Sequence, residues 1–316
     1  MLENFIFSVN AVMPIFMLLA IGYIIRLRGW TDFATNRKMN AVVFNLGLPI
    51  LMYRDVSTSD ILGFFDGAFL IYALITTTLI FIVTMALGYW YFKDRKIAGS
   101  FSVACFRSNY AVMGLPLIAR TGGEVGAGLG VLVIAFVIPL YNILNAIALA
   151  GKNDESLKGI AGLKLIVKNV FNPLMIGVLI GLVVSLLNIG LPTVVHVSID
   201  YIARMTTPLA LLVIGGSLDF SKIASRYKPA VVVAAIKLVV IPLIFVPIAI
   251  WLGFGPEAVL VLYVMYATPT AISSYAIVCN MGGDESLVLN SILLTMTLTV
   301  FTFTVGLFLL RTIGAI

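Results

Sequence analysis

Four landmarks in the first half of this chain return in the second half at a nearly constant distance. Asn10 and Pro14 form an N-x-x-x-P step, and Asn169 and Pro173 repeat it 159 residues later. The other landmarks recur in the same register: Gly22 as Gly181, Pro49 as Pro208, and Gly122-Gly123-Glu124 as Gly282-Gly283-Asp284. A fixed period over the whole length indicates an internal duplication. In an apolar chain, such a duplication is typical of a transporter built from two structural repeats.

The composition indicates that lipid rather than water surrounds the folded chain. Hydrophobic residues make up 61% of the 316 positions and charged residues 11%, whereas soluble domains have about 45–50% and about 25%. The mean hydropathy is +1.11. The first residues lack a basic region, and no small-residue cleavage site follows the first apolar run. We therefore expect this run to be a retained helix rather than a signal peptide.

Apolar runs of the length needed to cross a bilayer, about 20 residues each, occur ten times. The predicted segments cover roughly 5–25, 37–53, 66–92, 97–119, 125–150, 166–188, 194–217, 229–252, 257–281 and 287–311. The longest polar connection, around 151–164, lies between the fifth and sixth segments, where the duplication predicts a joint. We therefore expect an all-α membrane protein with ten transmembrane helices in two five-helix repeats, residues 1–158 and 159–316.

Basic residues are distributed unevenly between alternate loops. One set of loops holds 14 of the 20 Lys and Arg residues and the opposite set holds 4, while Arg107 and Lys237 lie inside segments. By the positive-inside rule the rich side is cytoplasmic, so both termini are predicted to be outside. Five segments per repeat is an odd number, which inverts the second repeat relative to the first. The net charge of +6 then comes from these loops and needs no nucleic-acid partner.

The fourth and ninth segments carry helix-breaking residues at matching places in the two repeats. In the fourth segment, Pro116 removes a backbone donor and Gly114 lowers helix stability. The ninth segment offers a proline and several hydroxyls: Thr268, Pro269, Thr270, Ser273 and Ser274. A broken helix frees backbone groups that lipid cannot satisfy, so two matching breaks predict a substrate site near the membrane midplane. Ordinary proline kinks, which are common in membrane helices, are the alternative interpretation.

Several other polar side chains lie within the predicted segments, and some of them could contribute to this site. Asn109 could hydrogen-bond a carboxylate or an amide of a substrate, or else a neighbouring helix. Arg107 lies deep in the fourth segment, where its planar fork suits a carboxylate, although snorkelling to the cytoplasmic surface is an alternative. Lys237 is predicted to snorkel. Asn142 and Asn145 in the fifth segment could line a cavity or form structural bonds.

Several chemical signatures are absent from the sequence. We find no catalytic dyad, no metal-ligand spacing and no ATP-binding loop, so we predict neither an enzyme nor a bound metal or cofactor. None of the 14 acidic residues lies clearly at the centre of a predicted segment. Because proton relays generally use buried Asp, Glu or His, this disfavours a dedicated proton exchanger. Sodium coupling stays open, since unwound carbonyls and hydroxyls could coordinate the ion.

Residues 109–117, read as N-Y-A-V-M-G-L-P-L, resemble the crossover-helix motif of the auxin efflux carrier family. Two further regions are similar to family members. One is in the ninth segment and the turn after it, with A-T-P-T at 267–270, S-S at 273–274 and M-G-G-D at 281–284. The other is N-L-G-L-P at 45–49 in the second segment. The resemblance implies a scaffold domain of segments 1, 2, 6 and 7, a mobile transport domain of segments 3–5 and 8–10, and a dimer formed through the scaffold. It places Asn109, Pro116 and Pro269 at the substrate, where segments four and nine cross.

The resemblance also implies the kind of substrate, because the family moves organic anions such as auxin in plants and malate, malonate or related acids in bacteria. The short central loop departs from the long-loop plant members and argues against auxin itself. We therefore expect a secondary transporter of small carboxylates in the bacterial cytoplasmic (inner) membrane, with an elevator-type alternating-access mechanism. The expected substrate-binding residues are Arg107, Asn109, Gly114, Pro116, Thr268, Pro269, Thr270, Ser273 and Ser274.

Two other functions are compatible with the same sequence features. One is a sodium-coupled symporter of the bile-acid carrier type, which sodium-dependent uptake into vesicles would distinguish. The other is a membrane sensor that binds a ligand without transporting it, which tracer flux in liposomes would distinguish. In each case the expected partners are a small organic anion, membrane lipid and a second copy of the chain, with no nucleic acid.

Overall fold

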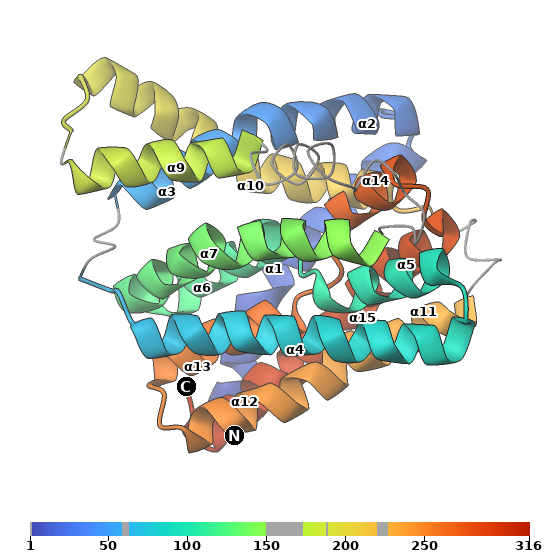
Figure 1. The fold of residues 1–316 in the computed structure, drawn as a ribbon. Coiled ribbons are helices and arrows are strands. Elements are labelled where there is room, and N and C mark those ends of the chain that lie inside the picture. Colours follow the sequence, from blue (N-terminus) through green and yellow to red (C-terminus); the bar gives the residue numbers. More distant parts are fainter. Residues whose placement is uncertain (1, 59–62, 150–172, 188, 220–226) are drawn as a thin grey trace, which may run out of the picture.

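The computed structural model is predominantly helical in the part of the chain that it describes, which comprises residues 2–58, 63–149, 173–187, 189–219 and 227–316 (Figure 1). Within that part, six helical runs are long and apolar enough to cross a membrane. They are α1 (Leu2–Leu27), α4 (Gly67–Phe92), α7 (Gly123–Leu149), α10 (Thr193–Ser217), the run Tyr227–Trp251 and α15 (Glu285–Thr312). These runs coincide with predicted segments one, three, five, seven, eight and ten. The expectation of an all-helical membrane protein is therefore confirmed.

The other predicted segments are helical but are divided into shorter elements. The second consists of α2 (Phe33–Val42), the π-helical turn η1 (Val43–Gly47) and α3 (Leu48–Thr58). The fourth consists of α5 (Arg95–Phe106), η2 (Tyr110–Gly114) and α6 (Leu115–Thr121), and the ninth of α13 (Pro256–Ala267) and α14 (Ser273–Asn280). The sixth is represented by α9 (Pro173–Leu186). Its first residues, including Asn169, and the predicted joint at 151–164 lie outside the described residues.

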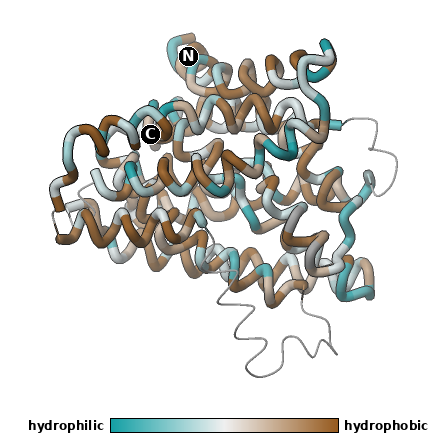
Figure 2. Tube along the Cα trace, turned by 90° about the horizontal axis from the view of Figure 1, so that it is seen from above, coloured by the Kyte–Doolittle hydropathy of each residue, from teal (hydrophilic) through white to brown (hydrophobic). Residues whose placement is uncertain are grey.

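The helices form two groups that face each other. Helices α2, α3, α9 and α10 pack together on one side, and α4 to α7, α12 (Ile241–Trp251) and α13 lie on the other (Figure 1). Helix α1 packs against both α10 and α15 and so links the two groups. Apolar residues cover most of the helical length (Figure 2). The three Trp residues, Trp30, Trp90 and Trp251, are all strongly exposed and lie at or near helix ends, as expected for side chains at a membrane–water interface.

Two close helix contacts join residues that are related by the sequence repeat. A Cβ atom built on Gly22 of α1 would lie 2.0 Å from the Leu212 carbonyl oxygen of α10. A Cβ atom on Gly181 of α9 would lie 2.9 Å from the Tyr53 carbonyl oxygen of α3. Gly181 follows Gly22 by 159 residues, and Leu212 follows Tyr53 by the same distance. Only glycine permits such approaches, which provide the van der Waals packing that holds helices together in lipid.

Four helices begin at an aspartate whose side chain accepts a hydrogen bond from the first turn. These N-cap residues are Asp32 of α2, Asp66 of α4, Asp94 of α5 and Asp284 of α15. An N-cap carboxylate satisfies backbone N–H groups that have no partner within the helix, and its charge is favoured by the helix dipole. The hydrogen bonds from Thr35 hold the pKa of Asp32 below its usual value.

The Gly-Gly-acid repeats also form turns, in which Gly123 and Gly282 have positive φ angles of 60° and 67°.

Three π-helical turns in the described part of the chain each end two residues before a proline. Turn η1 precedes Pro49, η2 precedes Pro116 and η5 (Ile236–Val240) precedes Pro242 at the start of α12 (Ile241–Trp251). A proline ring clashes with the carbonyl four residues earlier, and in each case that carbonyl lies inside the widened turn. A π-helical turn is a recognised cause of helix bending and is frequent at functional sites. Proline therefore widens these helices without ending them.

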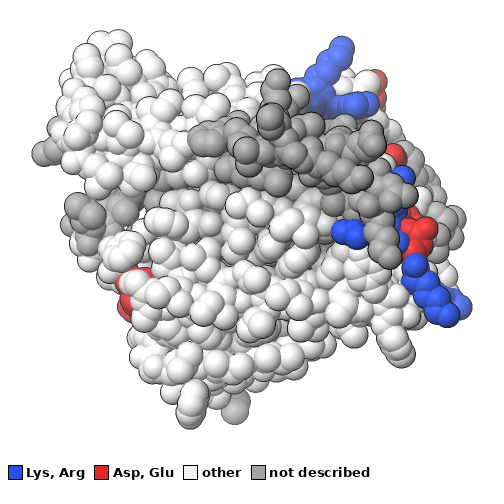
Figure 3. Space-filling model, in the orientation of Figure 1, with Lys and Arg blue, Asp and Glu red and all other residues white. Residues whose placement is uncertain are grey.

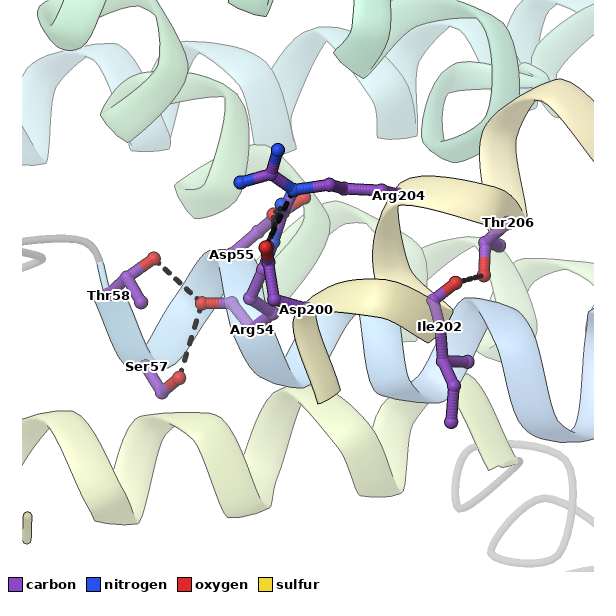
Figure 4. Close-up of polar contacts among 8 residues, drawn as sticks. All are labelled: Arg54, Asp55, Ser57, Thr58, Asp200, Ile202, Arg204 and Thr206. Carbon is purple, nitrogen blue, oxygen red and sulfur yellow. Dashed lines mark hydrogen bonds and ion pairs between the residues drawn. The ribbon is translucent and has the colours of Figure 1, made fainter. Parts of the chain in front are cut away.

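A cluster of ion pairs fixes α10 against α3 (Figure 4). Asp200 accepts from Arg54 Nη1 at 3.1 Å and from Arg204 Nε at 2.6 Å, and Arg54 Nη2 also lies 2.6 Å from Asp55 Oδ1. Charges within membrane helices are tolerated when they pair with one another. The cluster explains how α10 accommodates Asp200 and Arg204, which made the seventh predicted segment unusually polar.

Candidate substrate site at two interrupted helices

The backbones of two interrupted helices meet near the centre of the molecule. Residues 107–109 are not helical between α5 and η2, nor are 268–272 between α13 and α14. Asn109 N donates to the Pro269 carbonyl at 2.8 Å, and Ala271 N donates to the Arg107 carbonyl at 3.1 Å. These bonds form an isolated antiparallel bridge between the two stretches. Some of the backbone groups that the interruptions free are therefore satisfied by each other, as a membrane interior requires.

The first interruption lies earlier in the chain than the sequence predicted. It occurs at 107–109, whereas Pro116 belongs to the first turn of α6, where a missing N–H is tolerated. The widened turn η2 accommodates the proline ring. Gly114 is close-packed instead, because a Cβ there would lie 2.8 Å from the Tyr110 ring and 3.1 Å from Val264. The expectation that Gly114 and Pro116 break this helix is wrong. Pro269, in contrast, lies inside the second interruption.

Repeat-related residues touch each other where the interruptions meet. Ser108 and Thr268, which are 160 residues apart, share a hydrogen bond between their hydroxyls. Ser108 Oγ also donates to the Met265 carbonyl at 2.7 Å, and Thr270 Oγ1 donates to the Ala104 carbonyl at 2.7 Å. The Thr268 and Thr270 side chains are fully buried. Their hydroxyls hold the two stretches together and are not directed at a cavity.

A cavity of about 90 Å³ lies beside the crossing, between the two groups of helices. Its polar wall comes mainly from the interruptions and includes Arg107, Ser108, Asn109 and Ser273, together with Tyr141 of α7. Its opposite wall is largely apolar and comes from α2, η1, α3, α9 and α10. The residues of that wall are Asn40, Val43, Phe44, Leu48, Leu174, Ala210 and Ile214. No Asp or Glu is among the described residues that line the cavity.

Arg107 is buried, with 7% of its surface exposed, and it does not snorkel. Its Nη1 donates to Asn142 Oδ1 at 3.0 Å, and its Nη2 donates to Ser273 Oγ at 3.1 Å. Its Nε has no hydrogen-bond partner among the described residues. Both hydrogen-bond partners are neutral, so neither of them balances the positive charge of the guanidinium. Asn142, which the sequence left ambiguous, is thereby a structural partner of this arginine.

Asn109 lines the cavity and has an amide nitrogen, Nδ2, without a hydrogen-bond partner among the described residues. Only 6% of the surface of Asn109 is exposed. Buried polar groups are nearly always paired, and an exception requires an explanation. A ligand in the cavity is one such explanation, because Asn109 lines it.

The other hydroxyl residues predicted for the site differ in their surroundings. Ser273 lines the cavity and holds Arg107. Ser274 is fully buried, and it is not among the cavity-lining residues. Of the nine predicted site residues, Arg107, Asn109 and Ser273 therefore line the cavity, whereas Gly114, Pro116, Thr268, Pro269, Thr270 and Ser274 shape its surroundings.

Lys237 is buried rather than snorkelling, which corrects the sequence prediction. Only 2% of its surface is exposed, and its Nζ lies 3.5 Å from the carbonyl oxygen of Phe106. Phe106 is the last residue of α5. A helix end has carbonyls without intrahelical partners and a partial negative charge, both of which favour a cation. The interruption of α5 creates this binding place for Lys237 inside the molecule.

Helices of membrane-spanning length, two interruptions that meet and a polar cavity beside them are the features of a membrane transporter. The protein family described as membrane transport protein, which includes the auxin efflux carriers, matches residues 7–307. The chain belongs to this family, and it is a transporter rather than an enzyme.

Two relatives are similar to this chain over nearly its whole length. A Methanothermobacter thermautotrophicus protein named "Uncharacterized transporter" is 22% identical over 301 residues, which cover 93% of this chain and 96% of the relative. A Rhizobium meliloti protein named "Putative malonate transporter" is 23% identical over 313 residues, which cover 95% of each chain.

Proposed function

We propose that this protein is a secondary transporter of small organic carboxylates. The observation that carries the proposal is that two donor residues line the cavity, Arg107 and Asn109, and that Arg107 Nε and Asn109 Nδ2 have no hydrogen-bond partner among the described residues. An acid lining the same cavity would compete with an anionic substrate, and the described lining contains none. A guanidinium and an amide beside one another are suited to a carboxylate, which accepts charge-assisted hydrogen bonds from both.

The size of the cavity favours a small substrate. The volume of about 90 Å³ is small beside the roughly 300–1,000 Å³ of pockets that bind drug-sized ligands. A carboxylate of a few carbon atoms suits such a space better than an acid with an indole ring. Malonate is the first candidate, because the name of the Rhizobium meliloti relative refers to it.

The proposed architecture is ten transmembrane helices in two inverted repeats. Two observations support it: the exchanged contacts of Gly22 with Leu212 and of Gly181 with Tyr53, and the hydrogen bond between Ser108 and Thr268. Such pairs are expected when a two-fold axis relates the repeats.

Basic side chains gather at one end of the face drawn in Figure 3, which supports a cytoplasmic end there and external termini. The proposed location is the bacterial inner membrane.

The proposed mechanism is an elevator movement of one group of helices against the other. The scaffold would contain segments 1, 2, 6 and 7, which correspond to α1, α2 with α3, α9 and α10. The remaining segments would form the transport domain. The cavity supports this division, because its binding groups belong to one side and its apolar wall to the other. A dimer formed through the scaffold remains a prediction.

A binding experiment with matched ligands tests the proposed substrate class. Purified protein is titrated calorimetrically with malonate, acetate, indole-3-acetate and the neutral diamide malonamide, in sodium and in choline buffer. We expect malonate to bind more tightly than malonamide, because only a carboxylate gains from the charge of Arg107. Equal binding of acid and diamide would contradict the proposal. Binding that requires sodium would instead favour the sodium-coupled alternative.

A further inference from the structure

The cavity contains a positive charge that no carboxylate among the described lining residues balances. A guanidinium stays protonated under all physiological conditions, and the hydrogen-bond partners of Arg107 among the described residues, Asn142 and Ser273, are neutral. The ion pairs Arg54–Asp55, Arg54–Asp200 and Arg204–Asp200 belong to the separate α3–α10 cluster. Lys237 adds a second buried basic group next to this region, because its Nζ approaches the carbonyl of Phe106.

The wall opposite Arg107 cannot replace the missing negative charge. Its described residues are the apolar Val43, Phe44, Leu48, Leu174, Ala210 and Ile214, together with the uncharged Asn40. If the polar wall moves against the apolar wall during transport, Arg107 moves along a surface of low polarity. A buried charge is strongly disfavoured in such surroundings unless it is paired. An anion in the cavity supplies the pair.

We propose that the protein is an obligatory anion exchanger: its binding site crosses the membrane only when an anion lies beside Arg107. This inference rests on the proposed carboxylate function and adds a mode of transport to it. Each carboxylate that is released on one side must be replaced before the site can return. Net transport of a single anion is consequently slow, whereas exchange of one anion for another is fast. The combined concentration gradients of the two exchanged anions then determine the direction in which each anion moves.

The experiment compares exchange with net uptake in liposomes that contain the purified protein. Labelled malonate is added outside to vesicles that contain either unlabelled malonate or only the impermeant zwitterion buffer. Potassium with valinomycin holds the membrane potential at zero in both. We expect initial uptake to be about tenfold or more faster with internal malonate, a ratio equivalent to about 1.4 kcal/mol of barrier. Equal rates would overturn the exchange mechanism while leaving the carboxylate function intact. Absence of uptake under both conditions would overturn both.

Two substitutions of Arg107 test whether its charge causes the coupling. In Arg107→Gln the empty site is less charged, so the ratio of exchange to net uptake should fall toward one at saturating malonate. Arg107→Lys keeps the charge but not the planar fork, so its ratio should stay near that of the wild type even if its affinity falls. A wild-type ratio in Arg107→Gln would overturn the assignment to this residue. The comparison in wild-type protein needs no variant and stands even if the substitutions prevent folding.

Discussion

The substitution Asn109→Ala is expected to weaken substrate binding without destabilising the ligand-free protein. Asn109 lines the cavity, and its buried amide nitrogen has no hydrogen-bond partner among the described residues. We expect a carboxylate in the cavity to accept a hydrogen bond from this nitrogen. The main-chain bonds of Asn109, to the Pro269 carbonyl and from Met113 N, do not depend on the side chain.

The structure sets the size of both effects. A hydrogen bond to a charged group contributes about 1.5–3 kcal/mol, so loss of the amide should weaken malonate binding roughly 10- to 150-fold. An unsatisfied buried donor costs about 1–3 kcal/mol, and alanine removes that cost in the empty state. The lost side-chain packing offsets part of this gain. The ligand-free melting temperature should consequently stay the same or rise.

The assay combines calorimetric titration with malonate and thermal unfolding without ligand. Asn145→Ala is the matched control, because Asn145 on α7 is 2% exposed and its amide atoms also lack a partner in the described part of the chain. It does not line the cavity, so its substitution should leave the affinity unchanged. Unchanged affinity together with a lower melting temperature in Asn109→Ala would refute the reasoning, since it would make Asn109 a structural residue.

Three other predictions concern packing, charge and topology. Gly22→Val should lower the free energy of unfolding by about 1–3 kcal/mol, because its Cβ would lie 2.0 Å from a carbonyl oxygen of α10. Thermal unfolding measures this loss, and Gly190→Ala is the control because its Cβ would meet nothing within 4 Å. Arg107→Gln should weaken binding of malonate but not of malonamide in calorimetric titrations, and equal losses would contradict an electrostatic role. In protein without the two native cysteines, an impermeant thiol reagent applied to intact cells should label Glu3→Cys and not Glu155→Cys, whereas the opposite pattern would refute the proposed orientation.

The parts of the fold that depend on local sequence could be predicted. Long apolar runs located the six membrane-length helices to within a few residues, because hydropathy is a property of each run by itself. Proline and hydroxyl residues located the interruption at Pro269 for the same reason. The sequence drew attention to Asn109 and Arg107 because a polar side chain within a membrane segment is costly whichever way the helix is turned.

The remaining features depend on which helices become neighbours. The first interruption lies at 107–109 rather than at Pro116, because the π-helical turn η2 absorbs the proline and the backbone of the ninth segment pairs with residues 107–109. Burial of Lys237 requires the end of α5 to lie beside η5. The contributions of Asn40 and Tyr141 to the cavity arise only when α2 and α7 pack against the crossing. Neither residue carries a local signal that distinguishes it from other Asn and Tyr residues.

The measurement that tests the central claim most directly is competition for labelled malonate uptake in liposomes that contain the purified protein and internal malonate. Because recognition is assigned to Arg107 and Asn109 in a cavity of about 90 Å³, uptake should be saturable and should be inhibited by small carboxylates in proportion to their affinity. Malonamide, which has the same size but no charge, should have little effect at the same concentration. Uptake that malonamide and malonate inhibit equally, or that no small carboxylate inhibits, would contradict the assignment of a carboxylate site at the crossing.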